Sequence, residues 1–174
     1  MKLTKEEKKF WQRHYRIEKL TDIPKEMPGF ISIDTTDDDE YLFYLSQRVS
    51  IIPEIYLKGT LVTDEGVGHI SKIKLVRELT LREHDKVTKE SIAYFNQMAD
   101  LESLDITKTK ITLSDLSEQL NSQSLREVFL SSEKPEVNIE EKALILKQRM
   151  PNCDIYLDCT ETTDVFGNPE KPIF

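Results

Sequence analysis

The sequence predicts an α/β protein in which short strands and helices alternate in a repeating frame, and three observations lead to this prediction. First, large aliphatic side chains take the first, fourth and sixth places of residues 101–106. Second, the same frame starts at Ile52, Val76, Leu125 and, in a weaker form, Asn152, so that successive starts are 24, 25, 24 and 27 residues apart. Third, each frame is followed by aliphatic residues at helical spacing. A constant period of this length is typical of a solenoid, in which each unit covers the apolar face of its neighbour.

Length and composition favour a single soluble domain spanning residues 1–174, in which 38% of residues are hydrophobic and 32% are charged. The net charge of -8 argues against a nucleic-acid partner, because proteins that bind nucleic acid usually present a basic face. No run of about 18 apolar residues predicts a membrane span, and residues 1–16 lack the apolar segment of a secretory signal. These features predict a cytoplasmic protein.

The two cysteines, Cys153 and Cys159, lie along one predicted strand and its exit. Six residues of strand span roughly 20 Å, whereas a disulfide requires Cα atoms within about 7 Å of each other. We therefore expect both thiols to be free, as in a reducing compartment.

The N-terminal part, residues 1–27, is predicted to be a helical cap. Residues 4–20 indicate one helix with apolar side chains near one face, and the end of a solenoid needs such a cover. A membrane-surface helix is the alternative, but acidic residues interrupt its basic polar face.

Residues 28–159 are predicted to form five or six repeats, the first of them degenerate. Counting 24 residues back from Ile52 assigns Ile31 and Ile33 to the core, followed by a helix over 41–49. The acidic run 37–40 lacks the spacing and glycine of a calcium loop, so we interpret it as the first turn of this helix.

Three later helices have predicted caps at Thr63, Thr112 and Asn138, the last two each three residues before an acid, as in a capping box. Pro135 lies in the longest connection, where a helix could not continue. Residues 160–174 have no period and are predicted to be a C-terminal cap or tail.

The frame resembles the leucine-rich repeat family over residues 52–159 and more weakly over 28–51. The turn Thr-Lys-Ile-Thr at 109–112 is similar to that of short bacterial members, and Met-Pro-Asn-Cys at 150–153 resembles the end of such arrays. The resemblance implies a right-handed leucine-rich repeat solenoid, with parallel strands on the concave face, helices on the convex face and an N-terminal helical cap. It also implies protein recognition by the sheet, without catalysis or a cofactor.

The ninth place of the repeat departs from the family, which has Asn or Cys there. The residues at this place are Thr60, His84, Thr109 and Glu133. We therefore expect no buried Asn ladder and looser connections between turns.

No catalytic, cofactor or metal site is predicted. The three histidines lie in different elements without a cysteine or acid at metal spacing, no serine lies in a nucleophile elbow, and the five glycines form no phosphate loop.

The third, fifth and seventh places of each strand should face away from the core, because side chains alternate along a strand. Over five repeats these fifteen places hold six acids and two bases, with three aromatic residues among them. The predicted partner-binding residues are Glu54, Tyr56, Glu78, Asp105, Glu127, Phe129, Asp154, Tyr156 and Asp158.

This strip predicts a binding module for a basic protein, with Tyr56, Phe129 and Tyr156 as exposed anchors and the acids steering association. Such a module would act as an inhibitor or a toxin-immunity protein and would be a monomer when free. An adaptor or assembly factor that bridges two proteins is the alternative. A polar outer face that serves only solubility has the same composition, and an enzyme would need a deeper pocket than such a face offers.

Overall fold

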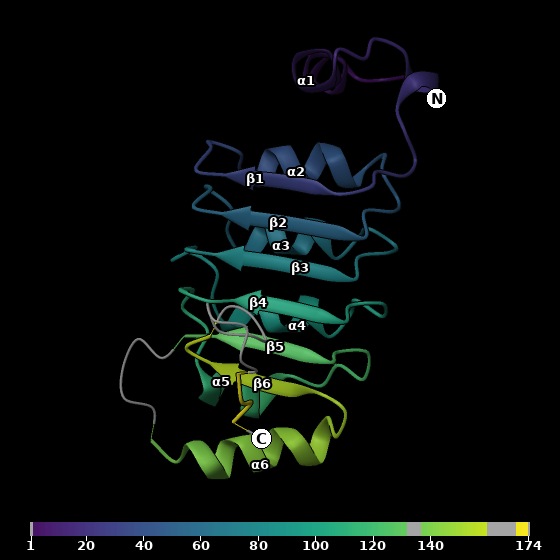
Figure 1. Ribbon diagram of the computed structural model, residues 1–174. Coiled ribbons are helices and arrows are strands. Elements are labelled where there is room, and N and C mark those ends of the chain that lie inside the picture. Colours follow the sequence, from purple (N-terminus) through teal and green to yellow (C-terminus); the bar gives the residue numbers. More distant parts are fainter. Residues whose placement is uncertain (1, 132–136, 160–169, 174) are drawn as a thin grey trace.

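The computed structural model describes residues 2–131, 137–159 and 170–173. Six parallel strands form one sheet whose spatial order follows the chain (Figure 1). The strands are β1 (Phe30–Ile33), β2 (Glu54–Lys58), β3 (Glu78–Arg82), β4 (Ser103–Ile106), β5 (Glu127–Leu130) and β6 (Asp154–Leu157). The predicted α/β class is confirmed.

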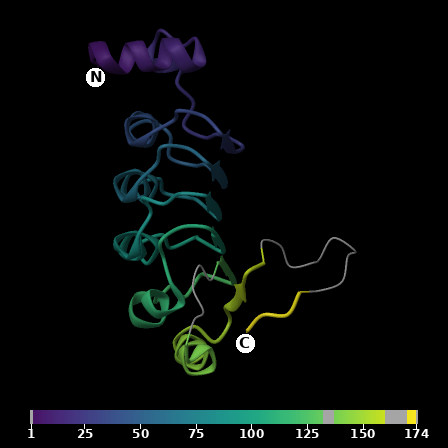
Figure 2. The same ribbon diagram turned by 90° about the vertical axis from the view of Figure 1, so that its left-hand side faces the viewer.

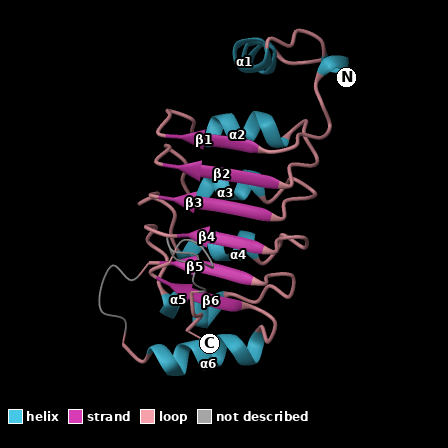
Figure 3. Cartoon of the chain, in the orientation of Figure 1, coloured by secondary structure: helices cyan, strands magenta, loops and turns pink. Residues whose placement is uncertain are grey.

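Helices lie along one face of this sheet, and no helix of the described residues lies on the other face (Figures 2 and 3). The α-helices are α1 (Lys5–Tyr15), α2 (Asp39–Ser46), α3 (Asp64–Ile70), α4 (Ile92–Phe95), α5 (Leu113–Gln119) and α6 (Ile139–Arg149). Two short 3₁₀ turns, η1 (Leu20–Asp22) and η2 (Lys89–Ser91), complete the described helices. We call the helix-free side the outer face of the sheet.

The strand register confirms the predicted frame from β2 to β6. The fourth places Ile55, Leu79, Leu104, Val128 and Ile155 are partners of one another across the sheet. Each of these side chains is at most 2% exposed, because it points between the sheet and the helices. The third and fifth places therefore face outward.

The predicted phase of the first repeat is wrong by one residue. Phe30, not Ile31, is the register partner of Ile55. The ring of Phe30 stacks on Tyr41 at 5.2 Å, while the Ser32 hydroxyl donates to Asp37 Oδ2 at 2.7 Å, so both inward positions are satisfied. Ile31 and Ile33 instead lie on the outer face, where they are 66% and 47% exposed.

Each of the first four strands is followed by a residue in the left-handed region, where the chain turns towards its helix. The φ angles are 53° at Asp34, 59° at Gly59, 62° at Glu83 and 57° at Lys108. Among these four positions, residue 59 is the one glycine, and a Cβ there would lie 2.5 Å from Asp34 Oδ1. Stacked turns of the same geometry keep the strands parallel.

Hydrogen bonds between helix starts connect the first three turns. The carboxylate of Asp39 accepts from the Thr63 amide at 2.8 Å and from its hydroxyl at 2.6 Å. Asp64 accepts from Thr88 in the same way, at 2.8 and 2.7 Å. We call these two arrangements the Asp–Thr clamps.

The structure confirms two of the three predicted helix caps. Thr63 caps α3, and Thr112 forms the predicted capping box with Asp115. In the acidic run 37–40, Asp38 is the N-cap of α2, and Asp39 and Glu40 lie in its first turn. Asn138 does not cap α6 through its side chain, because its backbone is left-handed, at φ 58°. Pro135 lies outside the described residues.

Helix α1 is shorter than the predicted 4–20. It ends at Tyr15 because Arg16 is left-handed, and the Arg16 amide donates back to the Gln12 and Trp11 carbonyls. The helix packs on α2 through Phe10, whose ring lies 5.0 Å from that of Tyr41. Trp11 is fully buried. The α1 helix thus packs against α2, the first helix after β1.

Candidate functional site

The strand register places the predicted partner-binding residues of β2 to β6 in continuous rows on the outer face. The third-place row holds Glu54, Glu78, Ser103, Glu127 and Asp154. The fifth-place row holds Tyr56, Thr80, Asp105, Phe129 and Tyr156. Adjacent strands lie about 4.8 Å apart, so neighbours within a row are in contact range.

The predicted exposure of Phe129 and Tyr156 is wrong. Their rings stack on each other at a centroid distance of 4.8 Å and an interplanar angle of 14°, and the residues are only 5% and 7% exposed. The segment 170–173 returns to the outer side of β6 (Figures 1 and 2), where the Ile173 amide donates to the Ile155 carbonyl at 2.7 Å. Phe129 and Tyr156 are therefore buried packing residues and not exposed anchors.

Asp105 is also unavailable to a partner, because Arg82 pairs with it. Arg82 Nε donates to Asp105 Oδ2 at 2.5 Å, and Asp105 is 6% exposed. Although burial alone would lower the pKa of Arg82, the hydrogen bond and charge of Asp105 raise it. The guanidinium lies 5.8 Å from the Tyr56 ring centroid and thereby orients that ring.

The N-terminal half of the outer face retains the exposed apolar side chains. Ile31 is the register partner of Tyr56, which is half-buried, and Glu54 and Glu78 are exposed on the same face. We call Ile31, Ile33, Glu54, Tyr56 and Glu78 the β1–β3 patch. Its two isoleucines were predicted to be core residues, whereas a 25-residue step from Phe30 to Ile55, like that from Val76 to Leu101, places them on the outer face.

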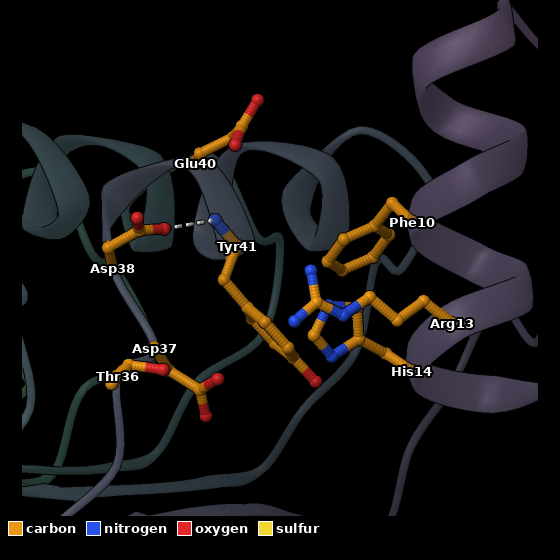
Figure 4. Close-up of a pocket in the computed structure, with 8 residues that line it drawn as sticks. All are labelled: Phe10, Arg13, His14, Thr36, Asp37, Asp38, Glu40 and Tyr41. Atoms are coloured by element: carbon orange, nitrogen blue, oxygen red, sulfur yellow. Dashed lines mark hydrogen bonds between the residues drawn. The ribbon is translucent and has the colours of Figure 1, made fainter.

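A pocket of about 240 Å³ lies between α1 and the loop that leads into α2 (Figure 4). Phe10, Arg13 and His14 come from α1 and face Tyr41 across it. The remaining lining residues are Thr36, Asp37, Asp38 and Glu40. We call this the α1–α2 pocket. No sequence pattern marked it, because its two walls are more than twenty residues apart in the chain.

Tyr41 is held in place inside this pocket. Its amide receives the capping bond from Asp38 Oδ1 at 3.1 Å, and its hydroxyl lies 2.7 Å from that of Tyr15. Burial and the Tyr15 hydroxyl raise the pKa of Tyr41 far above its ordinary value, so it stays neutral. The charged groups of the pocket are the carboxylates and Arg13.

A second hollow, of about 310 Å³, lies where the strands end, and Asp158 is among its lining residues. Lys58, Arg82 and Lys108 line it together with the carboxylates of Glu83 and Asp158. Glu83 lies 2.9 Å from Lys108 Nζ and 3.8 Å from Lys58 Nζ, and Arg82 pairs with Asp105, so each of these cations already has an acidic partner.

Within residues 2–131, 137–159 and 170–173, no three or more His, Cys, Asp or Glu side chains form a metal-binding group. Nor does any described helix have the length and apolar character to cross a membrane. No protein-family model matches the sequence, and a comparison with curated proteins gives no match.

Proposed function

We propose that the chain is a right-handed leucine-rich repeat solenoid whose concave face is the outer face of the sheet, and that it is a non-catalytic protein-binding module. The sequential order of the six parallel strands, the 24–25-residue steps between most repeats and the helices on one side support this architecture. In this architecture the helix-free face is the extended surface available to a partner.

The exposed apolar side chains of the β1–β3 patch carry this proposal. Ile31 and Ile33 are adjacent on one strand face and are 66% and 47% exposed, next to Tyr56. An apolar cluster rimmed by carboxylates is the composition of a protein interface, with the apolar centre supplying affinity and the acids attracting a basic partner. The partner is therefore a protein with an apolar spot inside a basic surface.

Inhibition or toxin neutralisation needs only this one surface. An adaptor would need a second one, and α6 offers it, because Leu144 and Ile145 are 48% and 39% exposed at the opposite end of the molecule. The stoichiometry of the purified complex separates these functions: a binary complex that silences the partner supports the inhibitor, and a ternary complex supports the adaptor.

The test uses the protein that co-purifies with the chain. The double variant Ile31→Ser, Ile33→Ser should bind it about 30-fold more weakly, mainly through faster dissociation, which corresponds to about 2 kcal/mol. Glu54→Lys with Glu78→Lys should mainly slow association. Leu61→Ser is the matched control, because Leu61 is 57% exposed outside the strands. Unchanged binding of the isoleucine variant, with folding intact, would refute the proposed surface.

A further inference from the structure

The first strand leaves one edge of the sheet open. β1 is the end strand and pairs only with β2 among the described strands. The Asp34 amide donates to the Lys58 carbonyl at 2.8 Å, which continues the β1–β2 ladder. Because alternate residues of a parallel strand bond to one neighbour, Phe30 and Ser32 also bond towards β2. The N–H and C=O groups of Ile31 and Ile33 therefore point to the open edge.

At the opposite edge of the same sheet, the described segment 170–173 makes a hydrogen bond to β6. The Ile173 amide donates to the carbonyl of Ile155 in β6 at 2.7 Å. The amides of Asp154 and Asp158 donate towards β5. The backbone N–H and C=O of Ile155 therefore point away from β5, just as those of Ile31 and Ile33 point away from β2. A segment outside the six strands thus already donates a hydrogen bond to one edge of the sheet.

The outward side of the open edge is apolar. A strand added to β1 would lie about 4.8 Å away, with its outward side chains beside Ile31 and Ile33. Small β-branched or aliphatic side chains fit there, because these two isoleucines are exposed and their neighbours on the other side are Tyr56 for Ile31 and Lys58 for Ile33.

The inward side of the open edge leads to the α1–α2 pocket. The inward residues of β1 touch its lining directly, since Phe30 stacks on Tyr41 and Ser32 donates to Asp37. An inward side chain of an added strand would lie next to these residues. Three carboxylates and one guanidinium line the pocket, so its acidic side chains outnumber the arginine, and the rings of Phe10 and Tyr41 form its walls. Carboxylates with aromatic faces favour a cationic side chain.

Resting on the protein-binding function proposed above, we propose that an extended basic segment of the partner adds to β1 as a seventh strand. Its outward apolar side chains pack on Ile31 and Ile33, and one inward lysine or arginine enters the α1–α2 pocket. This mode of recognition takes affinity from main-chain hydrogen bonds and specificity from alternate side chains.

Two peptides of equal composition test the inference on the full chain. The probe is acetyl-Lys-Val-Lys-Val-Lys-Val-Lys-amide, and the control is acetyl-Lys-Lys-Val-Val-Val-Lys-Lys-amide. We expect saturable binding of the alternating peptide, at least tenfold tighter than the control, with amide chemical-shift changes at residues 29–34. Equal affinities would show attraction by charge alone, and either that result or no binding would overturn the inference.

Two variants at one position separate the strand edge from the side chain. Ile33→Pro removes an edge amide but keeps an apolar residue, whereas Ile33→Thr keeps the amide. Strand addition predicts that proline weakens probe binding at least tenfold and more than threonine does. If threonine weakens it as much as proline, the face and not the edge binds, which contradicts this inference and leaves the proposed function standing.

The pocket is tested by Glu40→Gln, with Glu102→Gln as a control of equal charge change at an exposed residue away from the pocket. Glu40→Gln should weaken the lysine probe severalfold, while Glu102→Gln should not. Equal effects of the two variants would remove the pocket from the site.

Discussion

His84 Nε2 lies 2.7 Å from Thr60 Oγ1, so a hydrogen bond joins the ninth places of two successive repeats. Both residues are buried, at 2% and 9% exposure, and Thr109 at the next ninth place is also buried. The Asn ladder that the sequence lacks is replaced here by a hydroxyl–imidazole pair. Together with the Asp–Thr clamps, this pair connects the turns that were expected to be loosely held.

Stability should fall with acid because of His84. Burial lowers its pKa from 6.5, so the folded protein binds fewer protons than the unfolded chain below that pH. The stability that the folded protein gains from a neutral His84 is complete above pH 6.5, and it is lost as the pH falls towards the folded-state pKa of His84. His84→Gln should flatten the pH dependence of urea unfolding between pH 8 and 5. His69, whose pKa burial also lowers, accounts for a remaining slope. An unchanged slope in His84→Gln would contradict this assignment.

Asp64→Ala should destabilise the protein by about 1–3 kcal/mol, because the amide and hydroxyl of Thr88 lose their acceptor. Asp100→Ala is the control, since Asp100 is exposed and a surface change of this kind shifts stability by about 0.5 kcal/mol or less. Chemical denaturation measures both. Equal losses in the two variants would mean that the clamp adds nothing to folding.

Glu7→Ala should loosen the N-terminal cap. Glu7 accepts from Arg48 Nε at 2.8 Å and from the Thr4 amide at 2.8 Å, and these partners keep its pKa low although burial alone would raise it. Losing bonds to a charged group costs about 1.5–3 kcal/mol. Trp11, the one tryptophan of the chain, reports this locally, so its emission should shift to the red. The exposed neighbour Glu6→Ala should leave the spectrum unchanged, and a silent Glu7→Ala would argue against the cap contact.

The two thiols should differ in reactivity. Both are free; Cys153 is buried, which raises its pKa to about 12, and Cys159 is partly exposed. Burial and Glu170 also raise the pKa of Cys159. Iodoacetamide at pH 8 should therefore modify Cys159 first and Cys153 only as the protein unfolds, as mass spectrometry of digests would show. In urea both should react together. Equal rates in the native protein, or a bridge between them, would contradict this prediction.

The sequence was sufficient to predict strands β2 to β6, because the side chains of a strand alternate between its two faces. The rows through Ile55, Leu79 and Leu104 repeat at nearly constant steps, so the register of β2 to β6 and the direction of Glu54 and Tyr56 could be predicted without coordinates. The same frame separates Cys153 and Cys159 along one strand, and it therefore predicted that both thiols are free.

Exposure could not be predicted in this way. Whether an outward residue is accessible depends on its neighbours in space. Asp105 is buried because it forms an ion pair with Arg82, and Phe129 is buried because its ring stacks on Tyr156. The phase of β1 was missed because a serine takes an inward place that the pattern reserves for an aliphatic residue. The α1–α2 pocket depends on the docking of one helix, and no local spacing encodes that.

The Asp–Thr clamps are unevenly distributed along the chain, because Lys89 stands where Asp39 and Asp64 stand in the turns before it. Thr112 consequently takes its acceptor from Asp115 in its own helix. Among the described residues, this clamp therefore couples only the turns nearest the N-terminus, and we expect that difference to give a direction to unfolding. The half with β4 to β6 should fray first, and amide hydrogens of β2 and β3 should exchange last, so the segment that carries the β1–β3 patch is the most cooperative unit of the molecule.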